Sequence, residues 1–168
     1  MLSLQIKNVK QFMIDLLKSE YFDNFLLDEA YINTNASFYI DGTIQNGFYT
    51  DEDKEELSLS GLKKLPYSYL KNNCFELIKG KRTPVSFKFV FLLPKQTVDE
   101  IKKSTAISFD DASVTNMYFI CSYNDGKLFL TDGISYQTFV PGHELDKALD
   151  NYLKTFLNKL QIDYDEAI

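Results

Sequence analysis

The sequence is poor in the residue types that most often perform chemistry. Its 168 residues include no tryptophan, a single histidine, His143, and two cysteines, Cys74 and Cys121. An ordinary zinc site needs several Cys or His ligands, and no Ser/His/Asp or Cys/His arrangement can be argued from these spacings. His143 follows Pro141 and Gly142 at the start of a predicted helix. A histidine at a helix end is more often a surface residue than a catalytic one. We therefore predict no catalytic residue, no metal site and no cofactor.

Long apolar runs and paired cysteines are also missing. Cys74 and Cys121 lie far apart without a CxxC partner, which is typical of small buried hydrophobic residues in a reducing compartment, so we expect no disulfide. No run reaches the roughly 18 apolar residues of a membrane-spanning helix. In the opening, Met1 to Lys7, apolar and polar residues already alternate, whereas a signal peptide requires a continuous apolar segment. We predict a cytoplasmic protein that is neither exported nor inserted in a membrane.

Acidic residues outnumber basic ones by 24 to 18, for a net charge of −6. This balance argues against nonspecific adhesion of the whole surface to nucleic acid or membranes, although it leaves room for a local basic face. The acidic groups fall in predicted loops and tails and lack calcium-loop spacing, which favours solvated surface over a cation site. The groups are Asp28-Glu29, 51–53, Glu55-Glu56, Asp110-Asp111 and Asp163-Asp165-Glu166.

Periodicity predicts one α+β domain. Hydrophobic residues make up 45% of the chain, with 14 Phe and 11 Tyr, enough for a sizeable core of packed rings. Apolar residues at helical spacing predict helices over 8–20, 66–79, 97–103 and 145–160, the last being the clearest. A hairpin over 75–91 is an alternative to the second helix.

The predicted strands suggest that a pattern occurs twice. Strands are expected at 2–6 and 85–93, and each is followed by a helix and three strands in a meander. The turns are expected at Asp41-Gly42, Asp125-Gly126 and Asp132-Gly133. A pseudo-repeat with halves 1–84 and 85–160 is one interpretation, with an acidic insertion at 50–65 that forms a loop or a short exposed helix.

The segment 75–88 (FELIKGKRTPVSFK), with the opening Ile6 to Phe12, resembles an uncharacterised family of proteins from Gram-positive anaerobic bacteria. The resemblance covers nearly the whole chain; it implies a bacterial cytosolic origin and supplies no catalytic residue. The repeated order of strand, helix and three strands also resembles one domain of the DNA sliding clamps, although no clamp motif is matched residue by residue. A ring of such domains would require this chain to form a homo-oligomer.

The densest basic cluster is Lys79-Gly80-Lys81-Arg82-Thr83. It lacks the leading glycine and the spacing of a P-loop. One interpretation is a charged turn closing a helix, where cations suit the negative end of the helix dipole. The other is an anion- or partner-binding turn in which Arg82 is a fork-shaped donor assisted by Thr83, beside Lys79 and Lys81.

Basic residues concentrate in the predicted helices. The windows 7–20, 61–82, 95–103 and 143–159 hold 15 of the 18 basic residues and 8 of the 24 acidic ones. A clamp would use such a helical face to follow phosphates without reading bases. Ordinary propensity, with Lys in helices and Asp in turns, explains the same distribution.

Two functions from different classes fit the sequence. The first is a non-enzymatic binding or scaffold domain whose basic helical face contacts nucleic acid or a protein partner. The second is an enzyme or small-ligand-binding domain with a pocket under the C-terminal helix. The missing catalytic set favours the first.

Overall fold

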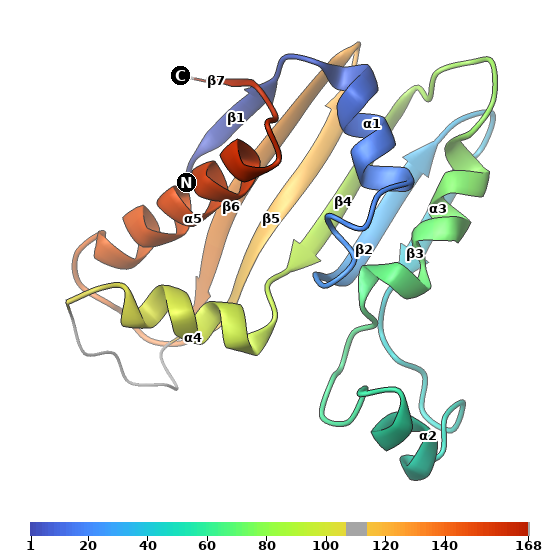
Figure 1. Ribbon diagram of the computed structural model, residues 1–168. Helices are drawn as coiled ribbons and strands as arrows, with labels where there is room; N and C mark the ends of the chain where they lie inside the picture. The colour runs from blue at the N-terminus through green and yellow to red at the C-terminus, as the bar shows by residue number, and fades with distance from the viewer. Residues whose placement is uncertain (107–113, 168) are drawn as a thin grey trace.

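The protein is an α+β domain built on one seven-stranded antiparallel sheet, seen in a computed structural model that describes residues 1–106 and 114–167 (Figure 1). The strand order is β3-β2-β4-β5-β6-β1-β7. The strands are β1 Ser3–Ile6, β2 Leu26–Asn33, β3 Ser37–Asp41, β4 Ser86–Leu92, β5 Val114–Asn124, β6 Lys127–Tyr136 and β7 Tyr164–Glu166.

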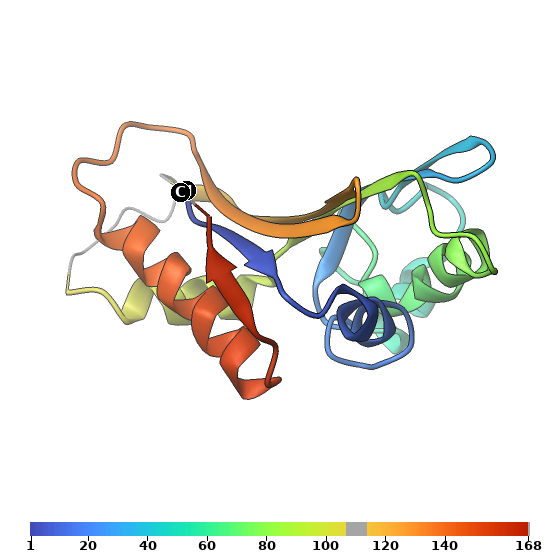
Figure 2. The ribbon, with the colours of Figure 1, turned by 90° about the horizontal axis from the view of Figure 1, so that it is seen from above.

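Four helices cover one side of this sheet, and Figure 2 places α1, α3, α4 and α5 together on that side. A fifth helix, α2, stands apart below them in Figure 1. The helices are α1 Val9–Leu17, α2 Asp51–Glu56, α3 Lys71–Ile78, α4 Lys95–Lys103 and α5 Glu144–Lys159, and a short 3₁₀ turn, Tyr67–Tyr69, precedes α3. All four helices predicted from periodicity are confirmed, and the alternative hairpin over 75–91 is wrong because α3 occupies its first part.

Local signals explain where these helices start and what they bury. The Asn8 side chain accepts a hydrogen bond from the Gln11 amide at 3.1 Å, which satisfies one of the free amides at the start of α1. Helix α5 turns a stripe of leucines toward the sheet, and each is at most 2% exposed: Leu145, Leu149, Leu153 and Leu157. The predicted amphipathic pattern therefore docks α5 on the core.

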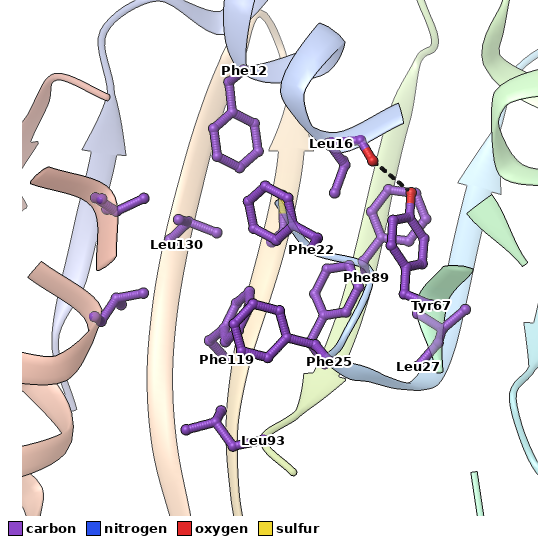
Figure 3. Packing of buried hydrophobic residues seen from close by; sticks show 14 of the residues in the cluster. Phe12, Leu16, Phe22, Phe25, Leu27, Tyr67, Phe89, Leu93, Phe119 and Leu130 are labelled. Atoms are coloured by element: carbon purple, nitrogen blue, oxygen red, sulfur yellow. Dashed lines mark hydrogen bonds between the residues drawn. The ribbon is translucent and has the colours of Figure 1, made fainter. Parts of the chain in front are cut away.

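The core is a cluster of packed rings, as the composition predicted. Phe22 lies at its centre, with ring centroids 5.6 Å from Phe12 and Phe156 and 5.9 Å from Phe91 (Figure 3). Tyr67 is fully buried and donates a 3.0 Å hydrogen bond to the Leu16 carbonyl, which links the 3₁₀ turn to α1. Burial without this partner would leave the hydroxyl unsatisfied.

Both cysteines are buried free thiols in this core, as predicted. Burial raises the pKa of the Cys74 thiol to about 12 and raises that of Cys121 as well, because the apolar surroundings disfavour a thiolate. Neither side chain has the exposure or the low pKa of a reactive cysteine.

One predicted turn is confirmed and another is wrong. Asp125 and Gly126 have φ values of 52° and 76°, as a two-residue hairpin between β5 and β6 requires. No turn forms at Asp132-Gly133, because β6 continues through both residues to Tyr136. Gly133 pairs with Tyr118 on β5, and an added Cβ would lie 2.5 Å from the Tyr118 hydroxyl. The glycine makes room for this ring inside a strand.

The third strand of each predicted meander is therefore absent from the described residues. In the first half, Thr43 forms only an isolated bridge with Lys64, because the Asp41 side chain accepts a 2.9 Å hydrogen bond from the Thr43 amide and bends the chain. Both halves nevertheless contain a strand, a helix, two strands and a helix in that order. The half-repeats 1–84 and 85–160 stay a prediction.

Asp132 is the most deeply buried carboxyl in the described part of the chain, at 1% exposure. Its Oδ1 accepts a 2.8 Å hydrogen bond from the Leu2 amide, while its buried Oδ2 has no hydrogen-bond donor among the described residues. Burial first, and then the hydrogen bond and charge of Asp150, raise the pKa of Asp132 to about 7. The folded protein therefore keeps a proton on Asp132 up to about pH 7, whereas the unfolded chain releases it near pH 4.

We expect Asp132→Asn to stabilise the protein above pH 7 and to remove a pH dependence of stability. A raised carboxyl pKa means that the folded state binds more protons between about pH 4 and 7, so the stability of the wild type falls as pH rises through that window. At about 1.4 kcal/mol per pKa unit, the gain at high pH has an upper limit of about 4 kcal/mol. Urea unfolding at several pH values measures it.

The control is Asp125→Asn, an exposed carboxyl in a left-handed turn that Asn also tolerates. It should leave the pH profile unchanged. An Asp132→Asn protein that is less stable than the wild type at pH 8 would mean that the ionised carboxylate is favourable in the fold.

Candidate binding groove between α1 and α3

A groove of about 550 Å³ lies between α1 and α3, at the end of the sheet where β5 turns into β6. In Figure 1 this is the upper end of the molecule, where the chain leaves α3 and arches over to β4. Its walls are one face of α1, the last turn of α3 and the connection 79–84, and Tyr123 and Gly126 from the β5–β6 hairpin also line it. Three segments far apart in the sequence thus form one concave surface.

The floor of the groove is apolar. Met13, Ile14 and Leu17 come from α1, and Phe75 and Ile78 come from α3. Ile14 remains 43% exposed although it is a large aliphatic residue. Covering this floor with another apolar group is favourable, by about 25 cal/mol for each Å² of apolar surface that is removed from water.

The rim of the groove is cationic. Five basic side chains line it, and the described lining residues include no Asp or Glu; the five are Lys10, Lys18, Lys79, Lys81 and Arg82. Lys79 pairs with Glu76 at 2.5 Å, and the Lys18 ammonium lies 5.2 Å from the centre of the Phe75 ring. Within the described chain, Lys10, Lys81 and Arg82 form no ion pair. A concentrated positive potential therefore faces the opening.

The four residues singled out from the sequence all lie in this groove: Lys79, Lys81, Arg82 and Thr83. Lys79 caps the C-terminal end of α3. The α3 carbonyls there repel anions, so attraction must come from the side chains.

Sequence reasoning missed the contribution of α1. Lys10, Ile14 and Lys18 are spaced four residues apart, which places them on one face of the helix. That spacing was visible in the sequence, but nothing in the sequence indicated that this face would lie against the turn after α3.

Elsewhere on the helical side, several lysines are already neutralised. Lys71 pairs with Asp23 at 2.7 Å, and Lys154 pairs with Glu166. The predicted basic helical face is therefore interrupted at these positions, whereas Lys10, Lys81 and Arg82 of the groove have no carboxylate partner among the described residues.

The four leucines on the inner face of α5 are buried against the core. A pocket under the C-terminal helix stays a prediction. A smaller pocket, about 280 Å³, lies beside the end of α5 and includes Gln161 and Asp163, with Gln11 and Asp15 from α1 and the N-cap residue Asn8. Gln11 Nε2 already donates a 3.1 Å hydrogen bond to Asp15 Oδ1, which partly satisfies this polar wall.

The remaining candidates from the sequence lie apart from the groove. The His143 side chain is 86% exposed at the start of α5, and Asp110-Asp111 lies outside the described residues. Across 1–106 and 114–167, no three His, Cys, Asp or Glu side chains are grouped so as to hold a metal ion. Over the same residues, no helix is both long and apolar enough to cross a membrane.

Comparison with known proteins assigns the chain to a family whose function is unknown. No curated protein and no solved structure matches the chain. A family model matches residues 15–165, a span that includes α3, the connection 79–84 and most of the groove. The chain belongs to DUF5721, a family of unknown function.

Proposed function

We propose that the chain is a non-enzymatic binding domain that holds an acidic, partly apolar segment of a protein partner in the groove between α1 and α3. The observation that carries the proposal is the apolar floor ringed by Lys10, Lys18, Lys81 and Arg82, with no carboxylate among the described lining residues. The groove offers charge and hydrophobic surface, which are the two elements of partner recognition.

The two elements would contribute differently. An aromatic or aliphatic side chain seated between Ile14 and Phe75 would supply most of the affinity, because it desolvates apolar surface on both partners. Exposed ion pairs at the rim contribute about 0.2–1 kcal/mol each and mainly set the orientation and the association rate. The fork-shaped guanidinium of Arg82 favours a carboxylate held by two hydrogen bonds.

A nucleic acid is the competing partner. Its phosphates would use the rim cations, but a duplex backbone has no group that uses an aliphatic floor. The pairing of Lys71 and Lys154 with acids also breaks up the wider helical face that a clamp would need. The clamp-like arrangement, together with the bacterial and cytoplasmic origin, remains a prediction, and we favour the protein partner.

The test is a binding titration with a fluorescein-labelled synthetic peptide in which Phe, Leu and Glu are placed at amphipathic helical spacing. We expect saturable binding that weakens with salt, and that weakens about tenfold when Lys79, Lys81 and Arg82 are all replaced by Ala, as three exposed ion pairs would predict. Peptides with Gln for Glu, or Ser for Phe and Leu, should each bind more weakly.

A matched control replaces three exposed lysines outside the groove, Lys95, Lys147 and Lys159, by Ala and should bind as the wild type does. Peptide binding that is absent, or equal in both triple variants, would overturn the proposal. Duplex DNA in the same assay decides the alternative: tight binding with a steep salt dependence, flattened in the groove variant, would assign the site to nucleic acid instead.

A further inference from the structure

The structure contains an acidic, apolar segment of its own that is complementary to the groove. Helix α2 and its flanks project from the body at the lower end of Figure 1, opposite the connection between α3 and β4. We call residues 44–60 the arm. Within α2 no residue is buried, and Ile44 and Leu59 are buried without joining the main core.

The arm is strongly acidic. Its five carboxylates and one lysine, Lys54, give a net charge of −4, whereas the groove carries five cations. The helix is short, but the Thr50 side chain accepts from the Asp53 amide and the Asp53 side chain accepts from the Thr50 amide, at 3.1 Å each. This capping box holds the carboxylates in a fixed arrangement before any contact forms.

The arm also exposes hydrophobic side chains next to these charges. Phe48 is 76% exposed and packs edge-on against Tyr49, with ring centroids 4.9 Å apart, and Leu57 is 44% exposed. Large apolar side chains exposed within a charged segment are typical of a protein contact. Phe48 precedes Asp51 and Glu52 by three and four residues in the sequence. The segment therefore combines an aromatic ring and carboxylates, which the floor and rim of the groove would accept.

We propose that the arm of one copy of this chain binds in the α1–α3 groove of a second copy. This inference rests on the proposed function of the groove and names its occupant. The arm and the groove lie at opposite ends of the molecule, so the contact forms between copies. Because the two surfaces differ, it is a head-to-tail contact that yields a reciprocal dimer, a ring or an open chain.

The experiment measures mass by sedimentation velocity over a range of concentrations at low and high salt. The wild type should be larger than one copy at low salt and dissociate as salt rises, because the contact is charged. The arm variant Glu55→Lys/Glu56→Lys and the groove variant Lys81→Glu/Arg82→Glu should each remain monomeric. Both Lys substitutions lie in the last turn of α2, where the helix dipole favours cations.

Mixing the two variants is the decisive step. The groove variant retains a native arm and the arm variant retains a native groove, so the mixture should form a complex of one copy of each. Neither variant can extend that complex, which therefore stops at two copies. A mixture that stays monomeric overturns the inference.

Two matched controls guard against general effects of charge and hydrophobicity. Lys147→Glu/Lys159→Glu changes the net charge equally on exposed positions of α5 and should still associate. Phe48→Ser should abolish association, whereas Phe139→Ser, at a side chain 90% exposed outside the arm, should not. Association that survives the groove variant, or a wild type that is monomeric at low salt, overturns the inference.

The outcome is separable from that of the proposed function. The arm variant keeps an intact groove, so it should bind the synthetic acidic peptide at least as tightly as the wild type. If the peptide binds the groove and the wild type is monomeric, the groove is a binding site for another protein and self-association through the arm is wrong.

Discussion

Leu153→Asp is expected to prevent folding. Leu153 is 1% exposed in the middle of α5 and lies in the main core cluster. The substitution removes apolar packing and places a carboxylate where no described cation meets it, at a cost of about 5 kcal/mol or more. That cost matches the whole stability of many domains of this size. Thermal unfolding followed by circular dichroism should show no cooperative transition.

Thr155→Asp is the control for the same helix. It introduces the same charge two residues further on, at an exposed position, and should melt within a few degrees of the wild type. A Leu153→Asp protein that melts with the wild type would show that α5 is not docked on the sheet.

Gly42→Ala is expected to destabilise the protein strongly although it adds one methyl group. A Cβ at Gly42 would lie 1.7 Å from the Leu27 carbonyl oxygen, which is a backbone atom that cannot rotate away. The Gly42 amide donates to the Asp28 carbonyl at 3.0 Å, and its carbonyl accepts from the Leu65 amide at 2.9 Å, so the close approach is fixed from both sides. Overpacking against such backbone costs about 3 kcal/mol or more.

Gly47→Ala separates this clash from the ordinary cost of replacing a glycine. Gly47 has a φ of 85° with nothing near its missing Cβ, so Ala there should cost about 1–2 kcal/mol through the left-handed backbone alone. Denaturant unfolding of both variants measures the difference. Equal losses of stability would mean that β2 and β3 can separate locally at Gly42.

Local sequence signals predicted most of the elements. The leucine stripe of α5 and the Asn8 cap of α1 act within one or two helical turns, and Asp125-Gly126 fixes a hairpin through its own backbone preferences. The turn predicted at Asp132-Gly133 failed because the same residue pair can lie within a strand. There the partner strand supplies Tyr118 to cover the glycine, and a single-sequence pattern cannot include that partner.

The candidate site likewise has features that the sequence determined and features that depend on the tertiary structure. The sequence by itself determined the cationic turn 79–83, because its charge density is a contiguous signal, and it determined the acidic character of 50–65. Only the tertiary structure decided that Lys10 and Lys18 join that turn around an apolar floor, and that Asp132 is buried against Asp150. Those arrangements arise because α1, α3 and α5 pack on one sheet face, which brings together side chains that no sequence spacing relates.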